Sequence, residues 1–267
     1  MMDFRKTVFA IATLLLLSSC GASRQQAYLT GGEAARDEAA RAKDDGKAKD
    51  DSKAKDGAAD EVSLAERAEA HWKKRESIGD LWRSMELYEA AVKAQPDHRK
   101  AMARLARGHY LLAYGFLKKD DEILGAYDKG ARWGERIMGL RPEFRQKIEA
   151  GEKDYEALSV AKKEDVSGIY WAYSNLGKWS VKQGFTTVVK NKSKLKAFIE
   201  KVTALDEAFY HGAGHRGLGA FYAKAPSFAG GDLDKAQEHF KKSLAIAPKY
   251  LGTKVLMARY YAVKKQD

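Results

Sequence analysis

The feature that most constrains this chain is a pattern of small, aromatic and proline residues that recurs at the spacing of paired helices. Its clearest copy consists of Leu218, Gly219, Tyr222, Ala236, Phe240, Ser243 and Pro248. A second copy consists of Tyr173, Leu176, Gly177, Leu195, Ile199 and Val202. Small residues let two helices approach closely, and proline ends a helix because it lacks the N–H group that continues it. The pattern therefore predicts pairs of packed helices.

Two earlier segments repeat the second half of this pattern. They consist of Ser84, Tyr88, Ala91 and Pro96, and more loosely of Gly134, Ile137 and Pro142. The order of these residue types and a period of about 34 residues are those of the tetratricopeptide repeat. We therefore predict an all-α, right-handed tetratricopeptide-like solenoid of about four helical pairs, in which residues 250–265 form a C-terminal capping helix.

The repeats depart from a strict period in four places. Pro96 and Pro142 are 46 residues apart, so the extra residues are expected to lengthen the helix from Lys100 to Phe116 or the turn after it. Residues 147–164 add a further insertion. Residues 184–191 and 225–231 are expected to enlarge two turns between helices.

The N-terminus has the pattern of an export signal. Arg5 and Lys6 precede the apolar run 8–17, which is too short to span a bilayer. The run ends in Leu17-Ser-Ser-Cys20, which resembles the lipobox of bacterial lipoproteins. That resemblance implies cleavage before Cys20, a lipid on its thiol, and, because Gly21 follows, the outer rather than the inner membrane. The alternative is an incidental cysteine.

A charged segment separates this signal from the predicted helices. Residues 42–47 and 48–53 are a tandem of Ala, Lys and Asp, within a stretch that has little apolar surface to bury. We predict a signal peptide at 1–20, a solvated tether at 21–62 and a helical domain at 63–267.

Composition excludes several classes of protein. The single cysteine excludes an intramolecular disulfide and a cysteine-based zinc site, and no apolar run reaches the ~20 residues of a membrane helix. The net charge is +11, and 38 basic against 27 acidic residues lie after position 60. Such a domain suits phosphates, lipid headgroups or acidic partners. Nucleic acid is not expected for an exported protein.

Catalytic and metal motifs find little support in the sequence. His211 and His215 are four residues apart, but no glutamate follows His211, and the glycines between them favour a turn over a metal-binding helix. We expect no enzyme, no metal and no cofactor. An enzyme would need clustered carboxylates or histidines.

The C-terminal motifs point to a family. They are Phe209–Gly219, Pro226–Asp232, Lys235–Phe240, Tyr170-Trp171-Ala172 and Gly177-Lys178-Trp179. Over about residues 65–265 the chain resembles the TatT family, lipoprotein accessory components of tripartite ATP-independent periplasmic (TRAP) transporters. His211 and His215 depart from the proline that often adjoins the Gly-rich turn in that family.

The resemblance implies a non-catalytic, periplasm-facing lipoprotein of the bacterial envelope. Its expected partner is the solute-binding P component, and it is expected to form a homo-oligomer, with a trimer as the candidate stoichiometry. A ligand held in or passed through a groove or pore is a further expectation. The alternative is a generic tetratricopeptide scaffold for envelope or cell-wall assembly.

The phase of the repeats predicts a groove lined by the first helix of each pair. The candidate ligand- or partner-binding residues are Arg107, Tyr110, Trp171, Ser174, Lys178, His215, Arg216, Tyr222, Phe228 and Arg259. Spaced cations among aromatic residues suit an organic anion or a carboxylate-bearing tail of the partner. A hydrated face without a ligand is the alternative.

Overall fold

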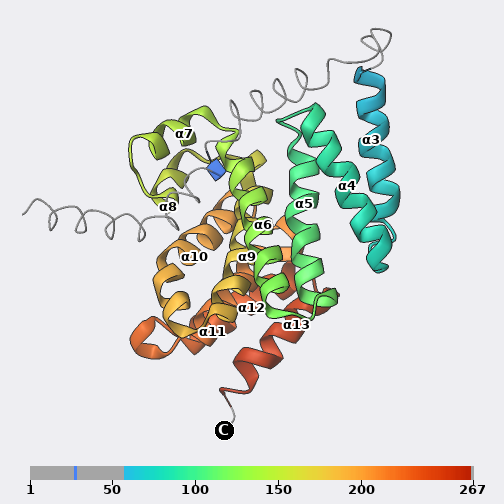
Figure 1. Cartoon of the computed structure of the whole chain (residues 1–267). Helices are drawn as coiled ribbons and strands as arrows, with labels where there is room; N and C mark the ends of the chain where they lie inside the picture. Colours follow the sequence, from blue (N-terminus) through green and yellow to red (C-terminus); the bar gives the residue numbers. More distant parts are fainter. Residues whose placement is uncertain (1–26, 29–56, 266–267) are drawn as a thin grey trace, which may run out of the picture.

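A computed structural model describes residues 27–28 and 57–265 of the chain. Over this part every regular element is helical and no strand is formed, which confirms the all-α class (Figure 1). None of the helices described is long and apolar enough to cross a membrane. The signal peptide and Cys20 lie outside the described residues, and the predicted domain boundaries stay predictions.

The long helices follow one another along the chain, and each packs against the next. They are α3 (Gly57–Trp72), α4 (Ile78–Ala94), α5 (Arg99–Leu111), α6 (Asp120–Gly139), α9 (Val166–Gln183), α10 (Phe185–Leu205), α11 (Phe209–Lys224) and α12 (Leu233–Ile246). Contacts between α6 and α9, and between α11 and α12, are the most extensive. The right-handed solenoid remains a prediction.

Short elements join and extend these helices. The insertion between α6 and α9 holds α7 (Pro142–Glu149), α8 (Asp154–Ala157) and the 3₁₀ turns η2 (Leu158–Val160) and η3 (Lys163–Asp165). The π-helical turn η1 (Leu112–Phe116) extends α5, and the 3₁₀ turn η4 (Ser227–Ala229) precedes α12. At the C-terminus α13 (Leu251–Leu256) continues into the π-helical turn η5 (Met257–Ala262), which packs on α11 and α12.

Helix ends follow from local sequence. The Ser77 and Asp232 side chains accept hydrogen bonds from backbone N–H groups in the first turns of α4 and α12. Pro142 begins α7, where its missing N–H costs nothing.

Two segments differ from the sequence prediction. Residues 185–191 belong to α10 and not to an enlarged turn, because Gly184, at φ 104°, makes the reversal by itself. Most of the Gly-rich segment 209–219 is helix, and only 210–212 have left-handed backbone.

Several positions require glycine because another helix lies against them and leaves no room for a Cβ atom. A Cβ at Gly134 would lie 2.6 Å from the Gly168 carbonyl oxygen, so α6 and α9 touch backbone to backbone. A Cβ at Gly219 would lie 2.9 Å from the Phe240 ring, which confirms the close packing that the repeat predicts there. At Gly177 the nearest side-chain atom would be 3.7 Å away, so that glycine is not required by space.

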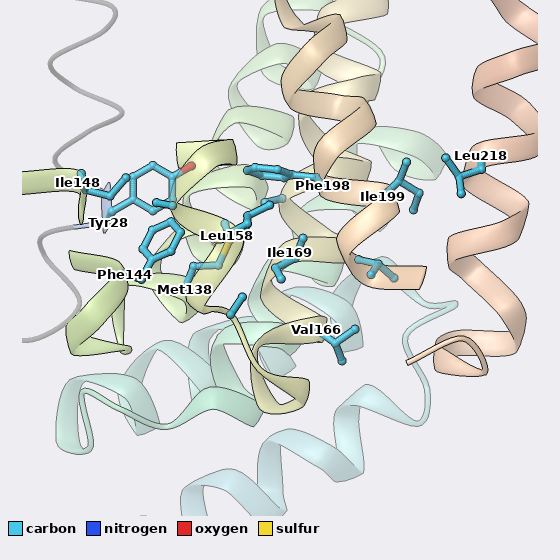
Figure 2. Packing of buried hydrophobic residues seen from close by; sticks show 14 residues of the cluster. Tyr28, Met138, Phe144, Ile148, Leu158, Val166, Ile169, Phe198, Ile199 and Leu218 are labelled. Atoms are coloured by element: carbon cyan, nitrogen blue, oxygen red, sulfur yellow. The ribbon is translucent and has the colours of Figure 1, made fainter. Parts of the chain in front are cut away.

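The largest core cluster joins the insertion to the centre of the helix array (Figure 2). It includes Phe144 from α7, Leu158 from η2, Phe198 from α10 and Leu218 from α11. It also includes Tyr28, from the segment predicted as a solvated tether.

Candidate functional site

A cavity of about 210 Å³ opens among α5, α9 and α11. It is lined by Lys100, Ala103, Arg104, Arg107, Ser167, Trp171, Phe209 and Tyr210. The first helices of three successive pairs supply all of these residues. Of the predicted groove residues, this lining includes Arg107 and Trp171, and the groove itself stays a prediction.

Arg107 is the cation held among aromatic rings in this cavity. Its guanidinium carbon lies 5.4 Å from the Trp72 ring centre, 5.7 Å from that of Trp171 and 5.1 Å from that of Tyr210. Its Nε is buried and has no hydrogen-bond partner within the described part of the chain. Burial lowers the pKa of Arg107, but a guanidinium stays charged at neutral pH.

The neighbouring cations are already paired. Arg104 donates two hydrogen bonds to the Glu69 carboxylate, at 2.7 and 3.2 Å, and Lys100 lies 3.6 Å from the same carboxylate. Among the described residues no carboxylate forms an ion pair with Arg107. Arg107 is therefore the cation that an anion entering the cavity would meet.

Tyr210 reaches the cavity through an unusual backbone turn. Tyr210, His211 and Gly212 have φ of 45°, 63° and 68°, which is left-handed backbone that costs a non-glycine residue about 1–3 kcal/mol. The turn places the Tyr210 ring 5.5 Å from Trp171 and 6.1 Å from Tyr250.

Arg216 holds this turn. It is only 5% exposed and donates hydrogen bonds to the carbonyl oxygens of Tyr210 and His211. Its guanidinium also lies 4.7 Å from the Tyr250 ring centre. Arg216 was predicted as a ligand-binding cation, and these contacts give it a positioning role.

Two more tyrosines contact the residues that line the cavity, and only the first of them, Tyr110, was predicted. Tyr110 lies 5.8 Å from Trp171 and, on its other side, stacks on Tyr114. Burial raises the pKa of Tyr250 to about 12, so its phenol stays protonated at neutral pH and can donate a hydrogen bond.

A second basic group lies further along α9 and α11. Ser174 and Lys178 follow Trp171 on one face of α9, since residues three and seven apart share a helix face. Lys178 lies 4.5 Å from the Tyr114 ring centre in η1, and Lys224 lies 5.0 Å from that of Tyr260 in η5.

Arg259 completes this group, at 5.5 Å from Tyr260. Burial, with the charges of Lys224 and Arg259, lowers the pKa of Lys178. Apart from Arg216, which holds the 210–212 turn, the predicted arginines and lysine form two groups: Arg107 in the cavity, and Lys178 with Arg259 beyond it.

Three predicted residues lie elsewhere. His215 Nε2 is 2.6 Å from the Glu207 carboxylate, and its Nδ1 is 2.9 Å from His239. Tyr222 stacks on His239 at 5.7 Å. Phe228 is 86% exposed in η4. The cavity lining includes none of the three.

The two histidines of the Gly-rich segment are apart in space. His211 stacks on Tyr250, whereas His215 faces His239. Within the described residues no cluster of three or more His, Cys, Asp or Glu could hold a metal ion.

The sequence analysis missed Trp72, Phe209, Tyr210 and Tyr250. Tyr210 lies in the left-handed turn, so helical phase counted back from Leu218-Gly219 misplaces it. Trp72 ends α3, which the repeat pattern did not cover, and Tyr250 lies between helices.

Comparison with known proteins agrees with the sequence motifs. The family model described as TRAP transporter T-component matches residues 83–267. No match was found among curated proteins. The chain therefore belongs to the TRAP transporter T-component family, an accessory component of transporters of the bacterial cell envelope.

Proposed function

We propose that this protein is a non-catalytic, lipid-anchored T-component that docks the solute-binding P component and holds an organic anion in the Arg107 cavity. The observation that carries the proposal is the half-buried Arg107, whose guanidinium lies among three aromatic rings, with its Nε buried and no carboxylate partner in the described residues. Its family supports the accessory role.

The chemistry of the cavity suits a carboxylate with an apolar body. A guanidinium binds a carboxylate through charge-assisted hydrogen bonds, each about 1.5–3 kcal/mol when water is excluded. The Trp171, Phe209 and Tyr210 rings would cover the apolar part of such a ligand. The Lys178 group lies along the same face of α9 and would meet a second anionic end, or an acidic surface of the P component.

The rest of the predicted assembly belongs to this proposal. It comprises a right-handed tetratricopeptide-like array, an anchor at Cys20 in the outer membrane and a homo-oligomer, with a trimer as the candidate. A groove formed by first helices would present the cavity to the docked partner.

Ligand binding can be tested by identifying what the purified protein releases and measuring its affinity. Small acids that co-purify with the full chain are freed by denaturation, identified by mass spectrometry and titrated back calorimetrically. Arg107→Gln should weaken binding about 10- to 100-fold, because charge-assisted hydrogen bonds are lost. Arg83→Gln is the matched control, since Arg83 lies exposed on α4 and pairs with Glu86. Equal affinities of the two variants would contradict the cavity as the binding site.

Docking is tested separately with a solute-binding P component of a TRAP transporter from the same organism. The lipidated chain should co-purify with it, and Lys178→Ala with Arg259→Ala should weaken that association. Capture of cell-wall assembly proteins in place of the P component would favour the scaffold alternative.

A further inference from the structure

Tyr28 is buried in the insertion although it precedes the helical domain by many residues. Its side chain is 2% exposed and its ring centre lies 5.3 Å from that of Phe144 in α7. Figure 2 shows it among Ile148, Phe144 and Leu158. Tyr28 therefore completes the core of the insertion.

The hydroxyl of Tyr28 enters a buried polar network. It donates a hydrogen bond of 2.6 Å to the Asp154 carboxylate and accepts one of 3.3 Å from Lys194. Lys194 also pairs with Asp154 and with Glu135, which is only 1% exposed. Loss of this phenol would leave buried charged groups short of a partner, which is costly.

The backbone of Tyr28 lies against Gly139 of α6, and its side chain lies among α7, α8 and α10. We call this site the Tyr28 seat. A Cβ at Gly139, the last residue of α6, would overlap the Tyr28 carbonyl group. Glycine at this position therefore admits the segment from the α6 side, while α7, α8 and α10 hold its ring and hydroxyl.

The seat shortens the connection between the folded molecule and Cys20. Tyr28 follows Cys20 by eight positions, a span of at most about 29 Å. If the connection began at Gly57, 37 residues could span about 130 Å. A seated Tyr28 thus fixes which end of the molecule can approach the anchor.

We propose that Tyr28 is a latch that holds the α7–α8 end of the molecule against the lipid bilayer. This rests on the lipidation of Cys20 in the proposed function. Residues 142–165 carry five basic and seven acidic side chains, so attraction to anionic lipid does not supply the orientation. The latch directs the other end of the helix array, with α13, away from the membrane (Figure 1).

The orientation can be measured on the lipidated full chain in phosphatidylcholine vesicles that contain an acceptor lipid. Cys20 is the sole cysteine, so Glu149→Cys on α7 or Val255→Cys on α13 provides a single site for a donor dye. Energy transfer should be strong from position 149 and weak from 255. Tyr28→Ala should lower transfer from 149 to the level at 255, and Gly139→Ala, which blocks the seat from the other side, should do the same.

Deleting residues 42–53 discriminates between the latch and a long tether. A latched molecule keeps the same transfer, because that segment lies beyond the latch. Increased transfer on deletion, or no change with Tyr28→Ala, would overturn the proposal. Adding phosphatidylglycerol to the vesicles should leave the transfer unchanged.

Different results would contradict the lipidation of Cys20 and the latch at Tyr28. If Cys20 carries no lipid, the chain does not bind vesicles, and the proposed anchoring fails. The seat is then measured in solution by hydrogen exchange: Tyr28→Ala should speed exchange in α7, α8 and the facing part of α10. Unchanged exchange there would overturn the latch itself.

Discussion

Buried ionic groups join the insertion to the helices at single residues, and Asp165 is the clearest example. It is 1% exposed and accepts hydrogen bonds from Arg141 Nε at 2.6 Å and from Arg99 Nη1 at 2.8 Å. Oδ2, the oxygen that binds Arg141, also accepts a hydrogen bond from the backbone N–H of Lys162. One carboxylate thus ties η3 to α5 and to the start of α7.

Replacing this carboxylate should destabilise the fold strongly. Asp165→Ala leaves the buried Arg141 guanidinium short of a partner, and we expect the free energy of unfolding to fall by about 3–5 kcal/mol. Glu200→Ala, which breaks the exposed pair between Glu200 and Lys196 on α10, should cost less than about 1 kcal/mol. Urea unfolding measures both, and similar losses in the two variants would contradict the ionic tie.

His109 makes stability depend on pH. Burial, and then the charge of Lys129, lowers the pKa of His109 to about 4. Below about pH 6.5 the unfolded chain binds a proton that the folded one does not, so stability is lost as pH falls from about 6.5 to 4. At pH 4.5 the loss should reach about 2–3 kcal/mol relative to pH 7.

The variant His109→Leu isolates this contribution. Its stability should fall less than that of the wild type between pH 7 and pH 4.5, as measured by urea unfolding at each pH. Parallel pH profiles for the two proteins would show that His109 does not titrate as its burial requires.

At the scale of elements, close approach of helix backbones sets the array. Gly134 on α6 faces Gly168 and Ala172 on α9, with no room for a methyl group between the helices. Gly125, on the same α6 helix, has open space where a Cβ would stand. Close packing therefore requires glycine at position 134 of α6 but not at position 125.

Alanine substitution at Gly134 and at Gly125 should have opposite effects on the stability of the fold. Gly134→Ala should destabilise by about 1–3 kcal/mol, because α6 and α9 must separate. Gly125→Ala should stabilise by up to about 1 kcal/mol, because alanine favours helix over glycine. Thermal unfolding of both variants measures the contrast, and a stable Gly134→Ala would mean that the helices are not in backbone contact.

Many elements could be predicted from the sequence. Helix pairs, the insertion around residues 147–164 and a C-terminal helix follow from periodicity, glycine and proline. The turn expected at 184–191 was wrong, because a single left-handed glycine reverses the chain without further residues. The Gly-rich segment was assigned to a turn because glycine marks both turns and close helix packing.

At the scale of the whole molecule, we expect a lipid at Cys20 to hold the protein at a membrane. Cys20→Ser should move the protein from the membrane fraction to the soluble fraction, because acyl chains supply the anchoring free energy. Mass spectrometry of the wild-type N-terminus checks the modification. Cleavage at another residue, or retention of Cys20→Ser in membranes, would contradict a lipid anchor at Cys20.

The sequence alone determined the helical class and the family, because these depend on local periodicity and on motifs that neighbours in sequence carry. It also assigned Arg107, Trp171 and Lys178 to helices, and their place in a groove stays a prediction. It could not separate Arg107, which has no carboxylate partner in the described residues, from Arg216, which backbone carbonyl groups satisfy.

Only the tertiary structure decided that difference, since it depends on which distant residues meet. The same holds for Tyr210, aimed into the cavity by a left-handed turn, and for Tyr28, buried 126 residues away from Asp154 in sequence. Burial of a polar group is set by partners that the fold assembles, and helical periodicity carries no information about them.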